Sequence, residues 1–130
     1  MDMNGALEGK VYPEATFTVD ERRVALFGEA VGEARPIVPP TFATVAEFAV
    51  FPSIVGDAEL GLDFTHVVHA EQEYEWHRPF RIGEALRVLP RIASIRQKAG
   101  NGFLTIETEM RDQDGELVVL ARATMIERVV

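Results

Sequence analysis

The feature that most constrains this fold is a short stretch that is apolar on nearly every side. It runs from Phe42 to Phe51, contains Glu47 as its single charge, and is followed by Pro52, which ends or kinks a helix. A helix that is apolar all round has to be buried all round. The stretch is too short to cross a bilayer. It therefore predicts a buried helix that needs a surface wrapped around it.

The segments after Gly61 supply that surface, because their period changes from helical to alternating. Strands are expected at residues 67–79, 85–98, 104–110 and 117–125, with a hairpin turn at residues 112–115. In the first strand Gln72, Tyr74 and Trp76 share one side, and His69 falls on the opposite, polar side. We expect an α+β hot-dog fold, in which a meander of four long strands forms a curved antiparallel sheet around the buried helix.

The N-terminal part predicts one more helix. Thr18 and Glu21 have the spacing of a capping box, an apolar face follows, and Gly32 is a plausible stop. The prolines of residues 34–41 favour an extended loop between this helix and the buried one. We expect residues 1–10 to be a loose lead-in and residues 11–130 to form a single domain.

Composition excludes several classes of protein. With 13 Lys and Arg against 21 Asp and Glu, the net charge is −8, which disfavours nucleic acid and anionic membranes as partners. The absence of cysteine excludes disulfides and thiolate chemistry. Residues 1–10 lack the pattern of a secretory signal, so we expect a cytoplasmic protein. No cofactor is expected, and no metal, because His66 and His69 lack a third ligand at a typical spacing.

Several motifs, taken in order, resemble one family. They are Phe27-Gly28-Glu29-Ala30-Val31-Gly32, Pro39-Pro40-Thr41-Phe42, His69-Ala70-Glu71-Gln72, and His77-Arg78-Pro79 with Gly83-Glu84. Together they resemble the N-terminal half of the MaoC-like dehydratases, which are (R)-specific enoyl-thioester hydratases. The resemblance is closer to the small non-catalytic subunits of heterodimeric 3-hydroxyacyl-thioester dehydratases. It implies an acyl-CoA or acyl-carrier-protein thioester as ligand, with the acyl chain in a tunnel beside the buried helix. It also implies a second hot-dog subunit, in a heterodimer or a homodimer.

The sequence departs from the family in one loop. Catalytic members carry an Asp and a His between the first helix and the buried helix, whereas residues 32–39 read Gly-Glu-Ala-Arg-Pro-Ile-Val-Pro. No catalytic residue can therefore be carried over. We expect an accessory subunit that binds the acyl chain while a partner supplies Asp and His. Two alternatives stay open: a self-sufficient acyl-CoA thioesterase that uses Glu47, and a non-catalytic homodimer that binds acyl thioesters.

Three residues are weaker catalytic candidates. Glu47 resembles the helix carboxylate that acts as base or nucleophile in thioesterase hot dogs. We favour the alternative that it faces a wet side of the helix or pairs with an arginine. Asp63 and His66 would form a dyad only on a helical turn, and their segment is expected to be a loop entering a strand.

The resemblance also suggests substrate contacts. His69 and Gln72 line an acyl or pantetheine channel or, as we favour, bond to backbone across the sheet or the interface. Arg78 and Arg81 meet the phosphates of coenzyme A or of a carrier arm, or they are surface charges at a strand end. Phe42 is a candidate acyl contact, although aromatic residues in such segments more often belong to the core or to an interface.

Overall fold

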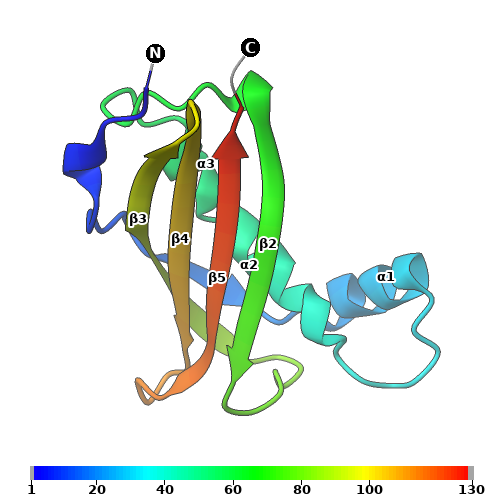
Figure 1. Cartoon of the computed structure of the whole chain (residues 1–130). Helices are drawn as coiled ribbons and strands as arrows, with labels where there is room; N and C mark the ends of the chain where they lie inside the picture. Colours follow the sequence, from blue (N-terminus) through cyan, green and yellow to red (C-terminus); the bar gives the residue numbers. More distant parts are fainter. Residues whose placement is uncertain (1, 129–130) are drawn as a thin grey trace.

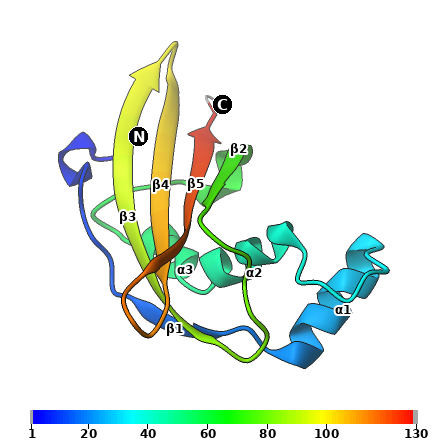
Figure 2. The same cartoon turned by 90° about the horizontal axis from the view of Figure 1, so that it is seen from below.

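A curved antiparallel sheet of five strands covers one side of a broken helix in the computed structural model, which describes residues 2–128 (Figures 1 and 2). The sheet order is β1-β3-β4-β5-β2. The strands are β1 (Ala15–Thr18), β2 (Val67–Trp76), β3 (Ala85–Lys98), β4 (Asn101–Arg111) and β5 (Leu117–Glu127). This is the predicted α+β arrangement, with a curved sheet packed against a central helical segment.

The strand order differs from the predicted meander. β2 pairs with β5 and not with β3, from Val67↔Glu127 to Trp76↔Val119. The chain after β2 passes behind β5 and β4 to reach the far side of the sheet (Figure 1). The edge strand β1 was not predicted, since its four residues are too few to show an alternating pattern. Both edges of the sheet are therefore strands that come early in the chain.

The first helix, α1 (Glu21–Val31), has its N-cap two residues later than the predicted Thr18. Asp20 is the N-cap, and its Oδ2 accepts from the backbone N–H of Arg23 at 2.9 Å. The predicted stop is correct, because Gly32 adopts φ 78°, a left-handed conformation that glycine accommodates without a Cβ clash. α1 projects sideways from the sheet in both views (Figures 1 and 2).

The predicted buried helix is broken into short pieces. They are the 3₁₀ turn η2 (Pro40–Phe42), α2 (Ala43–Phe48) and α3 (Phe51–Val55). Pro52 explains the break, since its ring collides with the carbonyl of the residue four positions earlier and it has no N–H to donate. Burial on every side was also wrong. Ala46 and Ile54 are fully buried, but the side chain of Phe48 is 56% exposed.

Residues 2–10 are not a loose lead-in. They include a 3₁₀ turn, η1 (Gly5–Leu7), and Met3 is buried in the core. The N–H of Asn4 donates to the carbonyl of Leu60 at 2.9 Å, and that of Gly9 donates to Ile92 at 2.8 Å. The bond from Asn4 holds the segment against the turn that follows α3, and the bond from Gly9 holds it against β3. Periodicity gave no sign of either bond, because both join backbone atoms.

A bulge in β2 changes which side chains face the helices. His69 pairs with Met125, but the next paired residue is Glu71, opposite Thr124, so Ala70 is an extra residue. The alternation of side chains between the two faces therefore shifts by one residue at the bulge. As a result His69 lies on the same face as Gln72 and Tyr74. Its predicted place on the polar face was wrong, because a simple alternating pattern carries no signal for a bulge.

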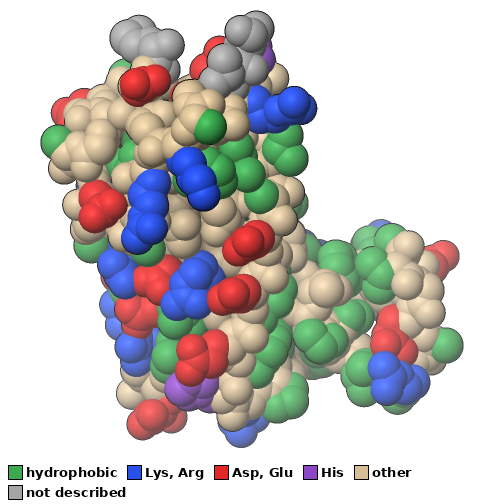
Figure 3. Space-filling model, in the orientation of Figure 1, with side chains coloured by type: hydrophobic (Ala, Val, Ile, Leu, Met, Phe, Trp, Pro, Cys, Tyr) green, Lys and Arg blue, Asp and Glu red, His purple; other side chains and the backbone are tan. Residues whose placement is uncertain are grey.

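The outer face of the sheet carries intermixed acidic and basic side chains (Figure 3). One row crosses four strands, from Arg91 to Glu107 to Arg122 to Glu73, each residue opposite the next in the strand register. Arg122 binds Glu107 at 2.6 Å and Glu73 at 2.8 Å, and Arg91 is also paired with Glu107. Such cross-strand pairs stabilise the register while the opposite face packs on the helices.

None of the helices within residues 2–128 is long and apolar enough to cross a membrane.

Candidate functional site

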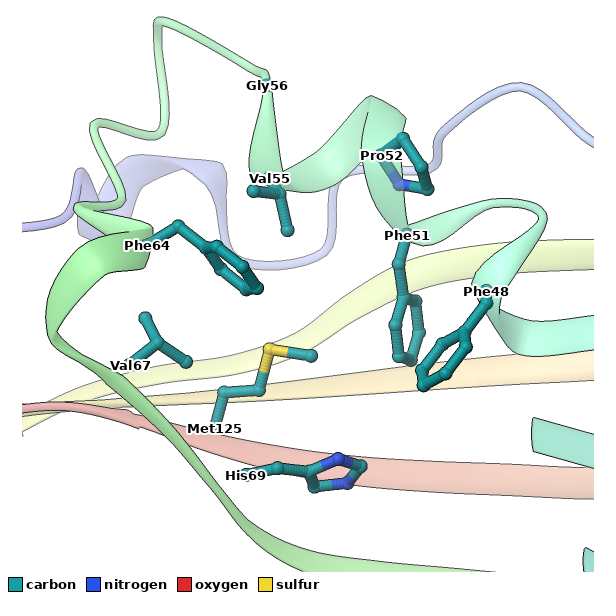
Figure 4. Close-up of a pocket in the computed structure, with 9 residues that line it drawn as sticks. All are labelled: Phe48, Phe51, Pro52, Val55, Gly56, Phe64, Val67, His69 and Met125. Carbon is teal, nitrogen blue, oxygen red and sulfur yellow. The ribbon is translucent and has the colours of Figure 1, made fainter. Parts of the chain in front are cut away.

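An apolar pocket of about 590 Å³ lies between the helical layer and the strands β2 and β5 (Figure 4). One wall is formed by the end of α2 and by three residues of α3, which are Phe51, Pro52 and Val55. The first residue of the 3₁₀ turn η3 (Phe64–His66) contributes to another wall. The lining residues are Phe48, Phe51, Pro52, Val55, Gly56, Phe64, Val67, His69 and Met125. A concave, mostly apolar site with a single polar group is typical of a small-molecule site.

The aromatic rim of the pocket reaches the surface. Phe48 is 56% exposed and Phe64 is 58% exposed, whereas Phe51 and Met125 are buried. Phe48 and Phe51 point from the helices toward His69 and Met125 (Figure 4). The pocket thus has an apolar inner wall and an open side. Most of its lining residues were not predicted as ligand contacts; the one available signal was the apolar character on both sides of the turn region at residues 53–61.

His69 is the one titratable residue of the lining. The bulge at Ala70 turns its side chain inward, next to Met125. Within residues 2–128 the ring of His69 makes no hydrogen bond and no ion pair. The prediction that His69 lines a channel is thus consistent with its place in the pocket, and its role in binding stays a prediction.

Glu47 lies outside the pocket, fully buried between α2 and β2. Gln72 Nε2 donates to both of its carboxylate oxygens, at 3.0 and 3.1 Å, and the Tyr74 hydroxyl donates to Oε1 at 2.8 Å. Burial raises the pKa of Glu47 to about 7, although the bonds from Tyr74 and Gln72 act in the opposite direction. Our favoured expectation of a wet or arginine-paired Glu47 was wrong, because its partners are neutral side chains of a neighbouring strand.

Two further polar atoms complete this buried cluster. Thr44 Oγ1 lies 2.5 Å from the Tyr74 hydroxyl, so α2 contacts β2 through two of its residues. Gln72 Oε1 is buried and has no partner within residues 2–128. Gln72 was predicted to line a channel or to bond to backbone, and the structure places it instead against Glu47.

Asp63 and His66 come together, contrary to expectation. Residues 63–66 form a 3₁₀ turn, which aligns positions three apart, and His66 Nδ1 lies 2.7 Å from Asp63 Oδ2. Asp63 also caps the turn by accepting from Thr65, and the bonds from Thr65 and His66 hold the pKa of Asp63 below its usual range. Neither Asp63 nor His66 lines the pocket, although Phe64 between them does.

The remaining predicted contacts lie elsewhere. Arg78 binds Glu84 through two bonds, at 2.9 and 2.7 Å, and approaches Asp112 at 3.3 Å. Together with Arg81 it lines a separate hollow of about 240 Å³ that also contains these two carboxylates. Phosphate binding there stays a prediction. Phe42 is 1% exposed and packs between the rings of Phe17 and Phe27, so it belongs to the core.

The loop at residues 32–39, where the family resemblance would place an Asp and a His, contains an ion pair. Arg35 binds the carboxylate of Glu33 through two bonds, both at 2.9 Å, and this holds the pKa of Glu33 at about 2. Glu33 is therefore ionised and paired at neutral pH. Among residues 2–128 no group of three or more His, Asp or Glu side chains is suited to holding a metal ion.

Comparison with known families agrees with this architecture. Residues 6–121 match the family described as the FAS1-like dehydratase domain region. The chain belongs to this family. It is 34% identical to a UPF0336 protein of Streptomyces coelicolor, over 98% of this chain and 97% of the relative. It is 32% identical to a UPF0336 protein of Saccharopolyspora erythraea, over 98% and 93%.

Solved structures share the fold. A chain of the HadBC complex, a (3R)-hydroxyacyl-ACP dehydratase from Mycobacterium tuberculosis, superposes with a TM-score of 0.78 at 22% identity, covering 92% of this chain and 96% of that one. A MaoC-like dehydratase superposes with a TM-score of 0.87 at 22% identity, covering 96% of this chain and 43% of that one. The predicted hot-dog fold and the resemblance to MaoC-like dehydratases are therefore confirmed.

Proposed function

We propose that this chain is the acyl-chain-binding, accessory subunit of a heteromeric (R)-specific enoyl-thioester hydratase or 3-hydroxyacyl-thioester dehydratase. The observation that carries the proposal is an open apolar pocket of about 590 Å³ in a chain whose residues 32–39 contain neither Asp nor His. A fatty acyl chain is the ligand that such a pocket suits, since its walls exclude water and offer almost no polar partner.

Hydration of an enoyl thioester needs groups that move protons at C2 and position water at C3. The pocket lining supplies one titratable residue, His69, and no carboxylate. Asp63 and His66 are close together but lie off the lining, and Asp63 is occupied by its cap bonds to Thr65. A second hot-dog subunit with its own Asp and His would supply the chemistry. The fold likeness to a chain of the HadBC complex is consistent with such a role.

The test is to produce the chain alone and together with a catalytic MaoC-like subunit that carries Asp and His. Complex formation is measured by light scattering, and hydration of (2E)-octenoyl-CoA by the loss of enoyl-thioester absorbance. We expect the chain alone to be inactive and the complex to be active. Activity of the chain alone at the rate of the complex would overturn the proposal. Stable acyl-CoA binding with no partner and no turnover would instead identify a binding homodimer.

Glu47 favours a second candidate, an acyl-CoA thioesterase. A carboxyl group with a pKa of about 7 is suited to act as a general base at neutral pH. Against this candidate, Glu47 is fully buried, is held by Gln72 and Tyr74, and does not line the pocket. Release of free thiol from acyl-CoA that is lost in Glu47→Gln would favour the thioesterase. Absence of thiol release from short and long acyl-CoAs would eliminate it.

A further inference from the structure

His69 is a hydrogen-bonding group without a partner in a pocket made otherwise of apolar side chains and one glycine. Its ring lies beside Met125 and points toward the space in front of Phe48 and Phe51 (Figure 4). A histidine with a structural role would bond to a neighbouring side chain or carbonyl, as His66 does with Asp63. Within residues 2–128 the ring of His69 has no such bond, so both ring nitrogens are available to a ligand or to water.

An acyl chain that fills the pocket displaces the water that hydrates this ring. A polar group that loses water without gaining a partner disfavours binding, whereas a ligand oxygen at the same place restores the lost bond. The imidazole serves as donor or as acceptor, and a hydroxyl group also serves as either, so the two are matched. The pocket therefore favours a chain that carries a hydroxyl near His69 over a chain of the same length without one.

The position of His69 determines which part of a bound acyl chain lies next to its ring. His69 is exposed, whereas Phe51 and Met125 on the inner wall are each 5% exposed. The hydrocarbon end of an acyl thioester would occupy the inner wall, and the carbonyl end with its bulky carrier would stay on the open side. His69 then faces the first carbons of the chain, and among these C3 is where a 3-hydroxyacyl thioester differs from a saturated one.

We propose that His69 is a specificity-determining residue, which makes the pocket prefer 3-hydroxyacyl thioesters to saturated acyl thioesters of equal length. The inference rests on the proposed function, because it takes the pocket to be the acyl site. It adds that the accessory chain itself distinguishes the two ligands and does not merely shelter their hydrocarbon. The bulge at Ala70 is the device that brings the histidine to this position.

The test is calorimetric titration of the full chain with octanoyl-CoA and with (R)-3-hydroxyoctanoyl-CoA. The same titrations are made on its complex with a partner subunit whose catalytic His has been replaced. We expect the hydroxylated ligand to bind about tenfold more tightly. His69→Phe should abolish that difference, because it removes the hydrogen-bonding group, and His69→Gln, which keeps a donor and an acceptor, should retain part of it. The control is His77→Phe, which lies outside the pocket and should keep the full difference.

The outcomes separate the inference from the proposed function. Equal affinity of the wild type for both ligands, or a preference that survives in His69→Phe, overturns the role of His69 and leaves the acyl pocket in place. Failure of both ligands to bind the chain and the complex overturns the acyl pocket, and with it this inference. Circular dichroism melting of each variant shows that a loss of preference does not come from unfolding.

Discussion

Strand β2 presents a polar side chain to the helices on either side of its bulge, and the two have different surroundings. Gln72 donates to the carboxylate of Glu47 inside the core. His69, before the bulge, faces an open pocket and has no partner within residues 2–128. The protein itself satisfies the donors of Gln72, so this half of β2 serves the fold. The hydrogen-bonding groups of His69 are available to a ligand or to water, so the part of β2 before the bulge is suited to ligand binding.

The largest effect on the free energy of unfolding is expected from the carboxyl group of Glu47, which is buried against β2. The pKa of Glu47 is raised from 4.5 to about 7 by burial, so between these values the folded chain holds the proton more tightly than the unfolded chain. The free energy of unfolding should therefore fall as the pH rises through this window, by about 3 kcal/mol in total. In Glu47→Gln this fall should be absent, as measured by urea denaturation between about pH 4 and about pH 8.

The control for this experiment is Glu71→Gln, which removes an exposed carboxyl from the same strand and should keep the wild-type pH profile. If Glu47→Gln and wild type lose stability in parallel as the pH rises, Glu47 is not the buried titrating group.

The next effect concerns the two bonds that Gln72 donates. Gln72→Leu leaves the buried carboxylate with Tyr74 as its remaining donor, and we expect a loss of about 2 kcal/mol at about pH 8. At about pH 5 the loss should be smaller, because Glu47 is then protonated and uncharged. Gln113→Leu, in an exposed turn, is the control. Equal losses in the two variants would mean that the bonds to Glu47 contribute nothing.

A smaller effect is expected at Tyr74. Tyr74→Phe removes one donor to Glu47 and the contact with Thr44, and we expect a loss of about 1 kcal/mol that is greater at high pH than at low pH. Thr44→Val interrupts the contact with Tyr74 but not the bond to Glu47, so its loss should not depend on pH. A pH-dependent loss in Thr44→Val would show that the hydroxyls act as one unit.

The smallest change in stability is expected for a residue of the pocket wall. The side chain of Phe64 is 58% exposed, so Phe64→Ala should change the free energy of unfolding by no more than about 0.5 kcal/mol. Binding of octanoyl-CoA should nevertheless weaken about tenfold, since the ring forms part of the pocket wall. Ile82→Ala removes another exposed apolar side chain, from a distant turn, and should leave binding unchanged. Unchanged binding in Phe64→Ala would place the acyl chain elsewhere.

Much of the fold could be predicted because burial imposes a period on the sequence. The alternation of β4 and β5 placed their core residues correctly, and Leu104, Ile106 and Met110 are fully buried. Strand order could not be predicted in the same way. The alternation of apolar and polar residues indicates which side chains of a strand share a face, but it does not indicate which strand is the neighbour in the sheet. That is why β2 was expected beside β3 and is found beside β5.

Less of the site could be predicted. Asp63 and His66 were expected to lie apart because the sequence gave no helical period there, yet a turn of three residues brings them together. Glu47 was expected to meet water or an arginine, because its partners lie 25 and 27 residues further along the chain and carry no charge. Neutral hydrogen-bond partners at such a separation cannot be recognised from the composition of the sequence or from the spacing of its residues.

The sequence by itself determined the four long strands, the family and the absence of Asp and His from residues 32–39, because these depend on residue type and local order. Only the tertiary structure decided that Glu47 is enclosed and that His69 faces an apolar pocket. The physical reason is distance along the chain for Glu47, whose partners lie on another element. For His69 it is the extra residue at Ala70, which turns one part of an edge strand over relative to the next.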